Sequence, residues 1–213
     1  MITLQAVVQV AALQEGPVPW PVASRPPHTW LALSGDCTDE ELGLFIAMLS
    51  GNSGARSAAG PAEFVDVLLA ERPLIVAGGL QVHDTDTATT VIPGCCAGLE
   101  DWRDWAQVLE GISPWLGHDP GPEVEFLDGR LRVWQHGGPE RHQGRWATVY
   151  IDVPRSVMPS LLAGVQRDLV SFLNALRVWT QQIGLGLRGE ALVSAIDESF
   201  AITAPFGRST TPA

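Results

Sequence analysis

The amino-acid sequence predicts an α+β protein: an antiparallel sheet containing a 123–135 hairpin, packed on one side by helices that include a long C-terminal helix. Within 123–135, two alternating apolar runs flank Asp128-Gly129, a dipeptide preferred in two-residue hairpin turns. Apolar residues recur every three or four positions from 162 to 183, which predicts the long helix. Strands and helices interleave without strict βαβ alternation, which favours α+β.

The first elements follow from local signals. Residues 3–13 are rich in valine and predict a strand, and the proline-rich segment up to about Pro27 predicts an extended loop. Thr38 and Glu41 have the spacing of a capping box, in which each side chain bonds the other residue's backbone N–H. Apolar residues follow at helical spacing, so an amphipathic helix begins here.

Glycine and proline divide the next part of the chain. Residues 51–57 predict a flexible loop, and Pro61 opens a second, short helix. Residues 73–77 predict a buried strand, with Gly78-Gly79 as a bend after it, and a short strand follows at 89–92.

An α-helix is expected to begin at Leu99, with acidic residues in its first turn, where the helix dipole favours negative charge. Gly111 is its expected end. On this helix Trp105 lies on the flank, and the buried stripe comprises Leu99, Trp102, Ala106 and Leu109.

The hairpin register predicts three opposed pairs: Val124 with Val133, Glu125 with Arg132, and Phe126 with Leu131. A strand at 146–153, the long helix ending at Gly184, and a last helix at 190–200 complete one domain over residues 1–203. Residues 204–213 are expected to be a loose tail. The apolar seam of the long helix is expected to pack on the protein's own sheet, with a homodimer contact as the alternative.

Composition argues against several classes of function. The 213 residues carry a net charge of −11 and contain no lysine, so the long-range field repels nucleic acid and attracts a basic protein. No apolar run is long enough for a membrane span, and the N-terminus lacks a signal-peptide pattern. We therefore expect a cytoplasmic protein with no nucleic-acid or membrane partner.

Two patterns offer chemistry. Gly94-Cys95-Cys96-Ala97-Gly98 fits the cysteine form of a nucleophile elbow, with Cys96 as nucleophile. His118 with Asp119, His136 or His142 could then act as the base. The alternative is a tight turn in which the cysteines pack as small apolar residues.

In His83-Asp84-Thr85-Asp86, alternate residues point the same way, so two carboxylates, or His83 and a neighbour, could hold a cation. Alternatively, Asp84 and Asp86 could bond local backbone groups in a turn. Zinc and nucleotide-binding motifs are absent, so no cofactor is expected.

Tryptophan and acid residues concentrate between positions 99 and 120. Eight tryptophans exceed what a core of this size ordinarily uses, and protein interfaces use aromatic anchors beside charged rims. The alternative is a core role for the tryptophans with the acids on a solvated face. The expected partner-binding residues are Glu100, Asp101, Asp104, Trp105, Trp115 and Asp119.

Residues 93–105 and 113–120 resemble proteins of high-GC actinobacteria, some of which are immunity proteins of polymorphic toxin systems. The resemblance covers about 30 residues. It implies a non-enzymatic α+β protein of the cytoplasm that binds and inhibits a toxin domain. It carries no catalytic residues, because such inhibitors have none. The alternative function is a cysteine-dependent hydrolase or transferase that uses Cys96.

Overall fold

The computed structural model describes residues 1–12, 18–51, 54–137 and 149–206, and it confirms the α+β class. The first sheet is antiparallel, with the order β2-β1-β3-β4. Its central strand β1 (Ile2–Gln9) lies between β2 (Trp30–Ala32) and β3 (Gly78–Asp84), and β4 (Thr89–Val91) forms the edge. The expected first strand is therefore present, but it ends at Gln9.

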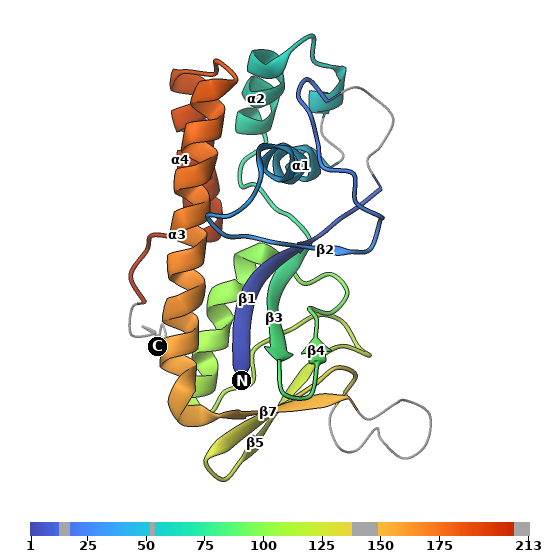
Figure 1. The fold of residues 1–213 in the computed structure, drawn as a ribbon, viewed down its shortest axis with the longest axis vertical. Helices are drawn as coiled ribbons and strands as arrows, with labels where there is room; N and C mark the ends of the chain where they lie inside the picture. Colours follow the sequence, from blue (N-terminus) through green and yellow to red (C-terminus); the bar gives the residue numbers. More distant parts are fainter. Residues whose placement is uncertain (13–17, 52–53, 138–148, 207–213) are drawn as a thin grey trace.

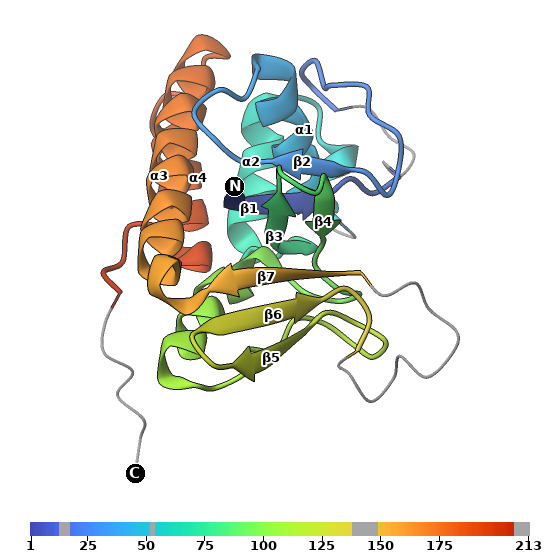
Figure 2. The same ribbon diagram turned by 60° about the horizontal axis from the view of Figure 1, so that its bottom comes forward.

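The predicted hairpin belongs to a second antiparallel sheet, with the order β5-β6-β7. β5 (Glu123–Leu127) and β6 (Arg130–Trp134) pair in the predicted register, and β7 (Tyr150–Pro154) adds to β6. Figure 2 shows this sheet below the first one. The antiparallel sheet that contains the hairpin is thus one of two sheets among the described strands, because β7 continues the hairpin while β3 and β4 continue β1. Residues 138–148, which include His142 and part of the expected 146–153 strand, lie outside the described residues.

Four α-helices surround the first sheet: α1 (Asp39–Leu49), α2 (Pro61–Ala70), α3 (Met158–Gln182) and α4 (Leu187–Phe200). The capping box of α1 is present, with hydrogen bonds in both directions between Thr38 and Glu41. In Figure 1, α3 and α4 run side by side along one side of the molecule, and α1 and α2 lie at one end.

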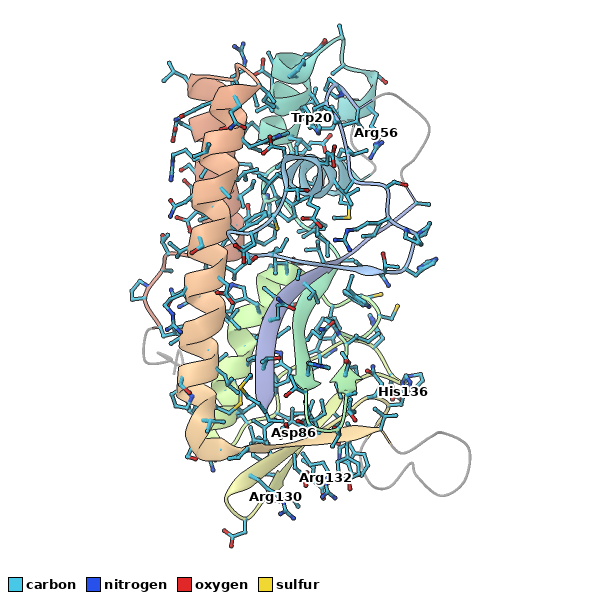
Figure 3. The ribbon with its side chains drawn as sticks, viewed as in Figure 1. Trp20, Arg56, Asp86, Arg130, Arg132 and His136 are labelled. Atoms are coloured by element: carbon cyan, nitrogen blue, oxygen red, sulfur yellow. The ribbon has the colours of Figure 1, made fainter. Side chains whose placement is uncertain are left out.

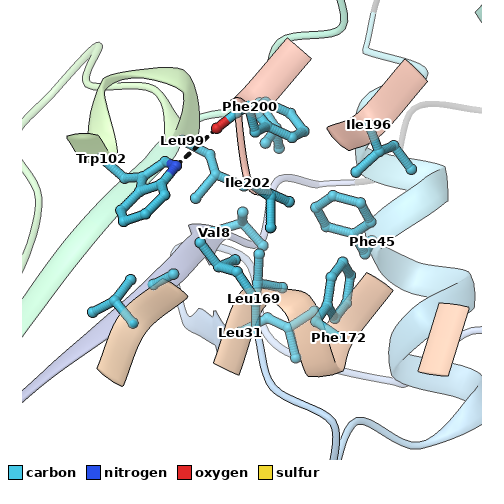
Figure 4. Packing of buried hydrophobic residues seen from close by; sticks show 14 of the residues in the cluster. Val8, Leu31, Phe45, Leu99, Trp102, Leu169, Phe172, Ile196, Phe200 and Ile202 are labelled. Carbon is cyan, nitrogen blue, oxygen red and sulfur yellow. Dashed lines mark hydrogen bonds between the residues drawn. The ribbon is translucent and has the colours of Figure 1, made fainter. Parts of the chain in front are cut away.

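One continuous hydrophobic core joins these elements (Figure 4). Phe45 of α1 and Phe172 of α3 meet edge to face, with ring centroids 4.9 Å apart. The seam of α3 is buried against the protein's own elements, β1 among them, as the first of the two expectations for this helix had it. Its buried members are Leu162, Val165, Leu169, Phe172, Leu176 and Trp179.

Two local predictions need correction. Residues 73–77 do not form a strand: β3 begins at Gly78, and the side chain of Ile75 is 65% exposed. A Cβ atom at Gly78 would lie 2.5 Å from the carbonyl oxygen of Val7, so this glycine allows β1 and β3 to approach. The expected bend is thus the start of the strand.

The expected flexible loop 51–57 contains a 3₁₀-helix, η1 (Gly54–Ser57), in which Arg56 is buried (Figure 3). Its guanidinium donates to the carbonyl oxygen of Ala47 and to Oγ of Ser50, at 2.9 and 3.1 Å. These groups lie at the C-terminal end of α1, where carbonyls lack helical partners and a cation is favourable. The arginine therefore fixes this segment to α1.

Candidate functional site

The segment expected to be an α-helix from Leu99 is a 3₁₀-helix, η2 (Leu99–Glu110), which packs against α3, α4, β1 and β3. A 3₁₀-helix has three residues per turn, so residues three apart lie above one another. The buried row therefore follows a period of three and comprises Leu99, Trp102, Trp105 and Val108.

This period corrects the predicted stripe. Trp105 is only 3% exposed, so its indole belongs to the core. We had expected it to be a partner-binding side chain at the surface, and this burial does not allow that role. Ala106 is half-buried and Leu109 is 38% exposed, although an α-helix would have buried both. Trp102 is fully buried, and its Nε1 donates to the carbonyl oxygen of Phe200 at 2.8 Å (Figure 4).

The same period gathers acidic side chains into a neighbouring row, which we call the acidic row: Asp101, Asp104 and Glu110, with Gln107 between the last two. Partial burial raises the pKa of Asp104, and the charge of Asp101 acts in the same direction. Asp101 also accepts a hydrogen bond from the backbone N–H of Gly98 at 3.4 Å. The carboxylates are thus close enough to repel one another.

Glu100 comes just before the acidic row in the chain. Its side chain is exposed overall, but its carboxylate lies against Gly98. This partial burial raises the pKa of Glu100, and the charge of Asp101 raises it further. Glu100, Asp101 and Asp104 therefore form one electrostatic group. A positive charge brought to it would favour the ionised carboxylates.

In the chain, Arg103 lies between Glu100 and Asp104, but its guanidinium faces the end of the described chain. Its guanidinium lies 4.2 Å from the ring centroid of Phe206 and donates to the carbonyl oxygens of Ala201 and Pro205. A hollow of about 240 Å³ lies between the acidic row and Phe206. Residues 204–206 are therefore held in place, contrary to the loose tail expected from 204 onward, and 207–213 lie outside the described residues.

Large apolar side chains are exposed next to the acidic row. Leu109, Ile112 and Trp115 are 38%, 52% and 48% exposed. Trp115 meets His118 edge to face at 5.7 Å, and it lines a small cavity together with Asp101. We call these three side chains the apolar strip. Asp119 is exposed four residues beyond Trp115.

Of the six expected partner-binding residues, the structure groups Glu100, Asp101 and Asp104, places Trp115 at a cavity with Asp101, and buries Trp105 in the core. Leu109 and Ile112 were missed. Leu109 was missed because the α-helical period assigned it to the core. The signal that could have corrected this was in the sequence, since Leu99, Trp102, Trp105 and Val108 are all apolar at a period of three.

Cys95 and Cys96 are both exposed, with their Sγ atoms 3.3 Å apart. Cys96 has a φ of 65°, and the contact with Cys95 raises the pKa of its thiol. The backbone N–H of His118 donates to the carbonyl oxygen of Cys95, but among the described residues no hydrogen bond joins the thiol of Cys96 to a histidine. A nucleophilic thiol needs such a base or a lowered pKa. The tight turn of the alternative expectation is present at residues 95–96, but the two cysteines are exposed and are not packed as small apolar residues.

The proposed cation ligands serve other contacts. Nδ1 of His83 lies 2.9 Å from Oγ1 of Thr90. Asp84 accepts hydrogen bonds from the backbone N–H of Asp86 and the hydroxyl of Thr87, which is the expected turn, and its pKa is lowered by them. Within the described ranges, no group of three or more acidic, histidine or cysteine side chains could hold a metal ion.

A different charge arrangement lies on the second sheet. Arg132 forms a two-point ion pair with Asp152 at 2.7 and 2.9 Å, and its guanidinium lies 4.1 Å from the ring centroid of Tyr150. The side-chain hydrogen bond from Arg132 lowers the pKa of Asp152. Figure 3 shows Arg132 beside Arg130 at this end of the molecule. These charges are compensated within the sheet, unlike those of the acidic row.

In the part of the chain that the structure describes, no helix combines the length and the apolar character needed to cross a membrane. Comparison of the chain with protein-family models, with curated proteins and with solved structures finds no match.

Proposed function

We propose that this chain is a cytoplasmic immunity protein, which binds and inhibits a basic toxin domain without catalysing a reaction. The observation that carries the proposal is the exposure of apolar side chains near acidic ones: Trp115 lines one cavity with Asp101, and Leu109 adjoins Glu110 in the chain. Interfaces combine a buried apolar centre with a polar rim, and aromatic side chains are frequent energetic anchors. Trp115 is the anchor in this arrangement, and Glu100, Asp101, Asp104 and Asp119 form the rim.

The charge of the whole chain supports the same partner. A net charge of −11 attracts a basic domain over long distances and accelerates its association. The arginines described above are paired or packed within the chain, so they do not neutralise the acidic row. Inhibition requires only that the bound surface of the toxin domain includes or covers its active site.

The raised pKa values supply a local reason for binding. The carboxylates of Glu100 and Asp104 are partly removed from water without an ion-pair partner among the described residues. An arginine or lysine from the partner would compensate these charges where they are already partly desolvated, and such pairs contribute more than fully exposed ones. Binding should therefore release protons when it occurs near the raised pKa values.

Affinity capture tests this proposal. The tagged protein is used as bait in its native lysate at low salt, beside a Glu100→Arg/Asp104→Arg bait and an Asp36→Arg/Glu71→Arg bait. Both variants change the net charge equally, but Asp36 and Glu71 are exposed acids outside the acidic row. We expect one basic protein at equal stoichiometry with the wild type and with the Asp36/Glu71 variant only. Capture of no basic protein, or equal capture by all three baits, would contradict the proposal.

A further inference from the structure

The adjacent thiols of Cys95 and Cys96 form a close pair beside the proposed interface, since Cys96 and Glu100 line one groove. Consecutive side chains of an extended chain point to opposite sides. At Cys96 the backbone is instead left-handed, a conformation uncommon for residues other than glycine, and the two Sγ atoms lie 3.3 Å apart. Both thiols are exposed, so a small reagent can reach them together.

Backbone hydrogen bonds hold this turn. The N–H of Gly94 donates to the carbonyl oxygen of Leu116, and the N–H of His118 donates to that of Cys95, each at 2.9 Å. A Cβ atom at Gly94 would lie 2.7 Å from the carbonyl oxygen of Leu116, so the two segments are in close contact. These contacts hold the backbone of the turn and so keep the two cysteines next to each other on one surface.

A bridging atom suits this separation better than a direct bond. A disulfide requires the sulfurs to close to about 2.05 Å, and neighbouring residues reach that distance only in a strained geometry. Two sulfurs bonded at about 2.3 Å to one tetrahedral atom are roughly 3.8 Å apart, whereas a linear centre would hold them roughly 4.6 Å apart. The observed 3.3 Å favours a bent centre with a still smaller bond angle.

The described surroundings define which bent centre fits. No third histidine, cysteine or acidic ligand is placed to complete a metal site there. The atom that bridges the two sulfurs must therefore complete its bonding with a substituent that it already carries. Cys96 also lines an open groove of about 310 Å³ together with Met48 and the exposed side chain of Ile75, which offers an apolar place for that substituent.

We propose that Cys95 and Cys96 together bind a trivalent arsenical that carries one organic substituent. Two arsenic–sulfur bonds form and two arsenic–hydroxyl bonds break, and each thiol proton leaves with a hydroxide as water. Arsenic stays trivalent, so no oxidant or reductant is needed. The site does not depend on the proposed immunity function.

Phenylarsine oxide is a suitable probe, because its reaction with two thiols releases one water. Intact-mass spectrometry of the folded protein should show one adduct, of the mass of the probe less one water. The adduct should persist in excess glutathione and be removed by 2,3-dimercaptopropanol. Maleimide labelling after unfolding should then find one free thiol, that of Cys37, which is half-buried and has a pKa raised by burial.

Serine variants assign the site. Loss of either thiol in Cys95→Ser or Cys96→Ser should weaken binding about 100-fold or more, because the second bond is no longer intramolecular. The Cys37→Ser variant is the matched control and should bind like the wild type. Absence of the adduct, its retention in either vicinal variant, or its loss in Cys37→Ser would overturn the proposal. Oxidation of the pair to a disulfide in place of adduct formation would also overturn it.

Discussion

At the scale of single residues, close approach decides what the sequence tolerates. Gly43 lies within α1, where a glycine normally weakens the helix. A Cβ atom there would lie 2.4 Å from the carbonyl oxygen of Pro21 and 2.7 Å from the ring of Trp20. Nε1 of Trp20 also donates to the carbonyl oxygen of Gly43 at 3.0 Å. The glycine thus allows the proline-rich segment to pack on the helix.

Gly43→Ala should lower the free energy of unfolding by about 1–3 kcal/mol, the usual cost of overpacking a core. Gly164→Ala in α3 is the matched control, because its Cβ would meet only Arg167, at 3.7 Å. That change should raise the free energy of unfolding by about 0.5–1 kcal/mol through helix propensity. Denaturant unfolding measures both variants. Equal effects of the same sign would show that the contact with Trp20 is not tight.

At the scale of elements, local chemistry predicted well where it acts alone. The capping box at Thr38 and the Asp128-Gly129 turn each specify their own geometry, so α1 and the β5–β6 register agree with the sequence. The period of η2 was ambiguous, because the sequence offers an apolar row at both spacings. Leu99 and Trp102 belong to either row, and the burial of Trp105 and Val108 in the core selects the period of three.

The candidate site shows the same division. Its acids and Trp115 were predicted from composition, because charge and aromatic content do not depend on helix type. Leu109 and Ile112 depend on the path of the chain after η2 and were missed. The division into two sheets was also missed, since strand order rests on contacts between segments distant in sequence, such as β1 with β3.

Paired substitutions test the period of η2. Trp105→Ala should lower the free energy of unfolding by about 3–5 kcal/mol, because a large buried side chain is removed from the core. Leu109→Ala should lower it by about 1 kcal/mol or less, since that residue is already 38% exposed. Thermal and urea unfolding of both variants provide the measurement. A larger loss of unfolding free energy for Leu109→Ala than for Trp105→Ala would indicate the α-helical arrangement instead.

At the scale of the whole molecule, stability and binding oppose each other at the acidic row. Burial raises the pKa values of Glu100 and Asp104 above their ordinary values in the folded state. Their contribution to stability is therefore complete at low pH and is lost as the pH rises through the folded pKa values. At neutral pH the free protein carries these charges at a cost that a basic partner would offset.

The Glu100→Gln/Asp104→Asn variant should accordingly be more stable than the wild type at pH 7. The difference should vanish below about pH 3.5, where both carboxyls are protonated even in the unfolded chain. Urea unfolding at a series of pH values measures the difference between the two proteins and so removes the effects of other groups. A difference that grows on acidification would contradict the raised pKa values.

The central claim is that the acidic row and the apolar strip form one interface for a basic domain. Calorimetric titration of the captured partner tests it most directly. We predict that Glu100→Arg/Asp104→Arg weakens binding about 100-fold or more. Trp115→Ala should weaken it about 30-fold, as expected for an aromatic anchor. The Asp36→Arg/Glu71→Arg control should stay within about 3-fold of the wild type. Equal affinities for all four proteins would contradict the account.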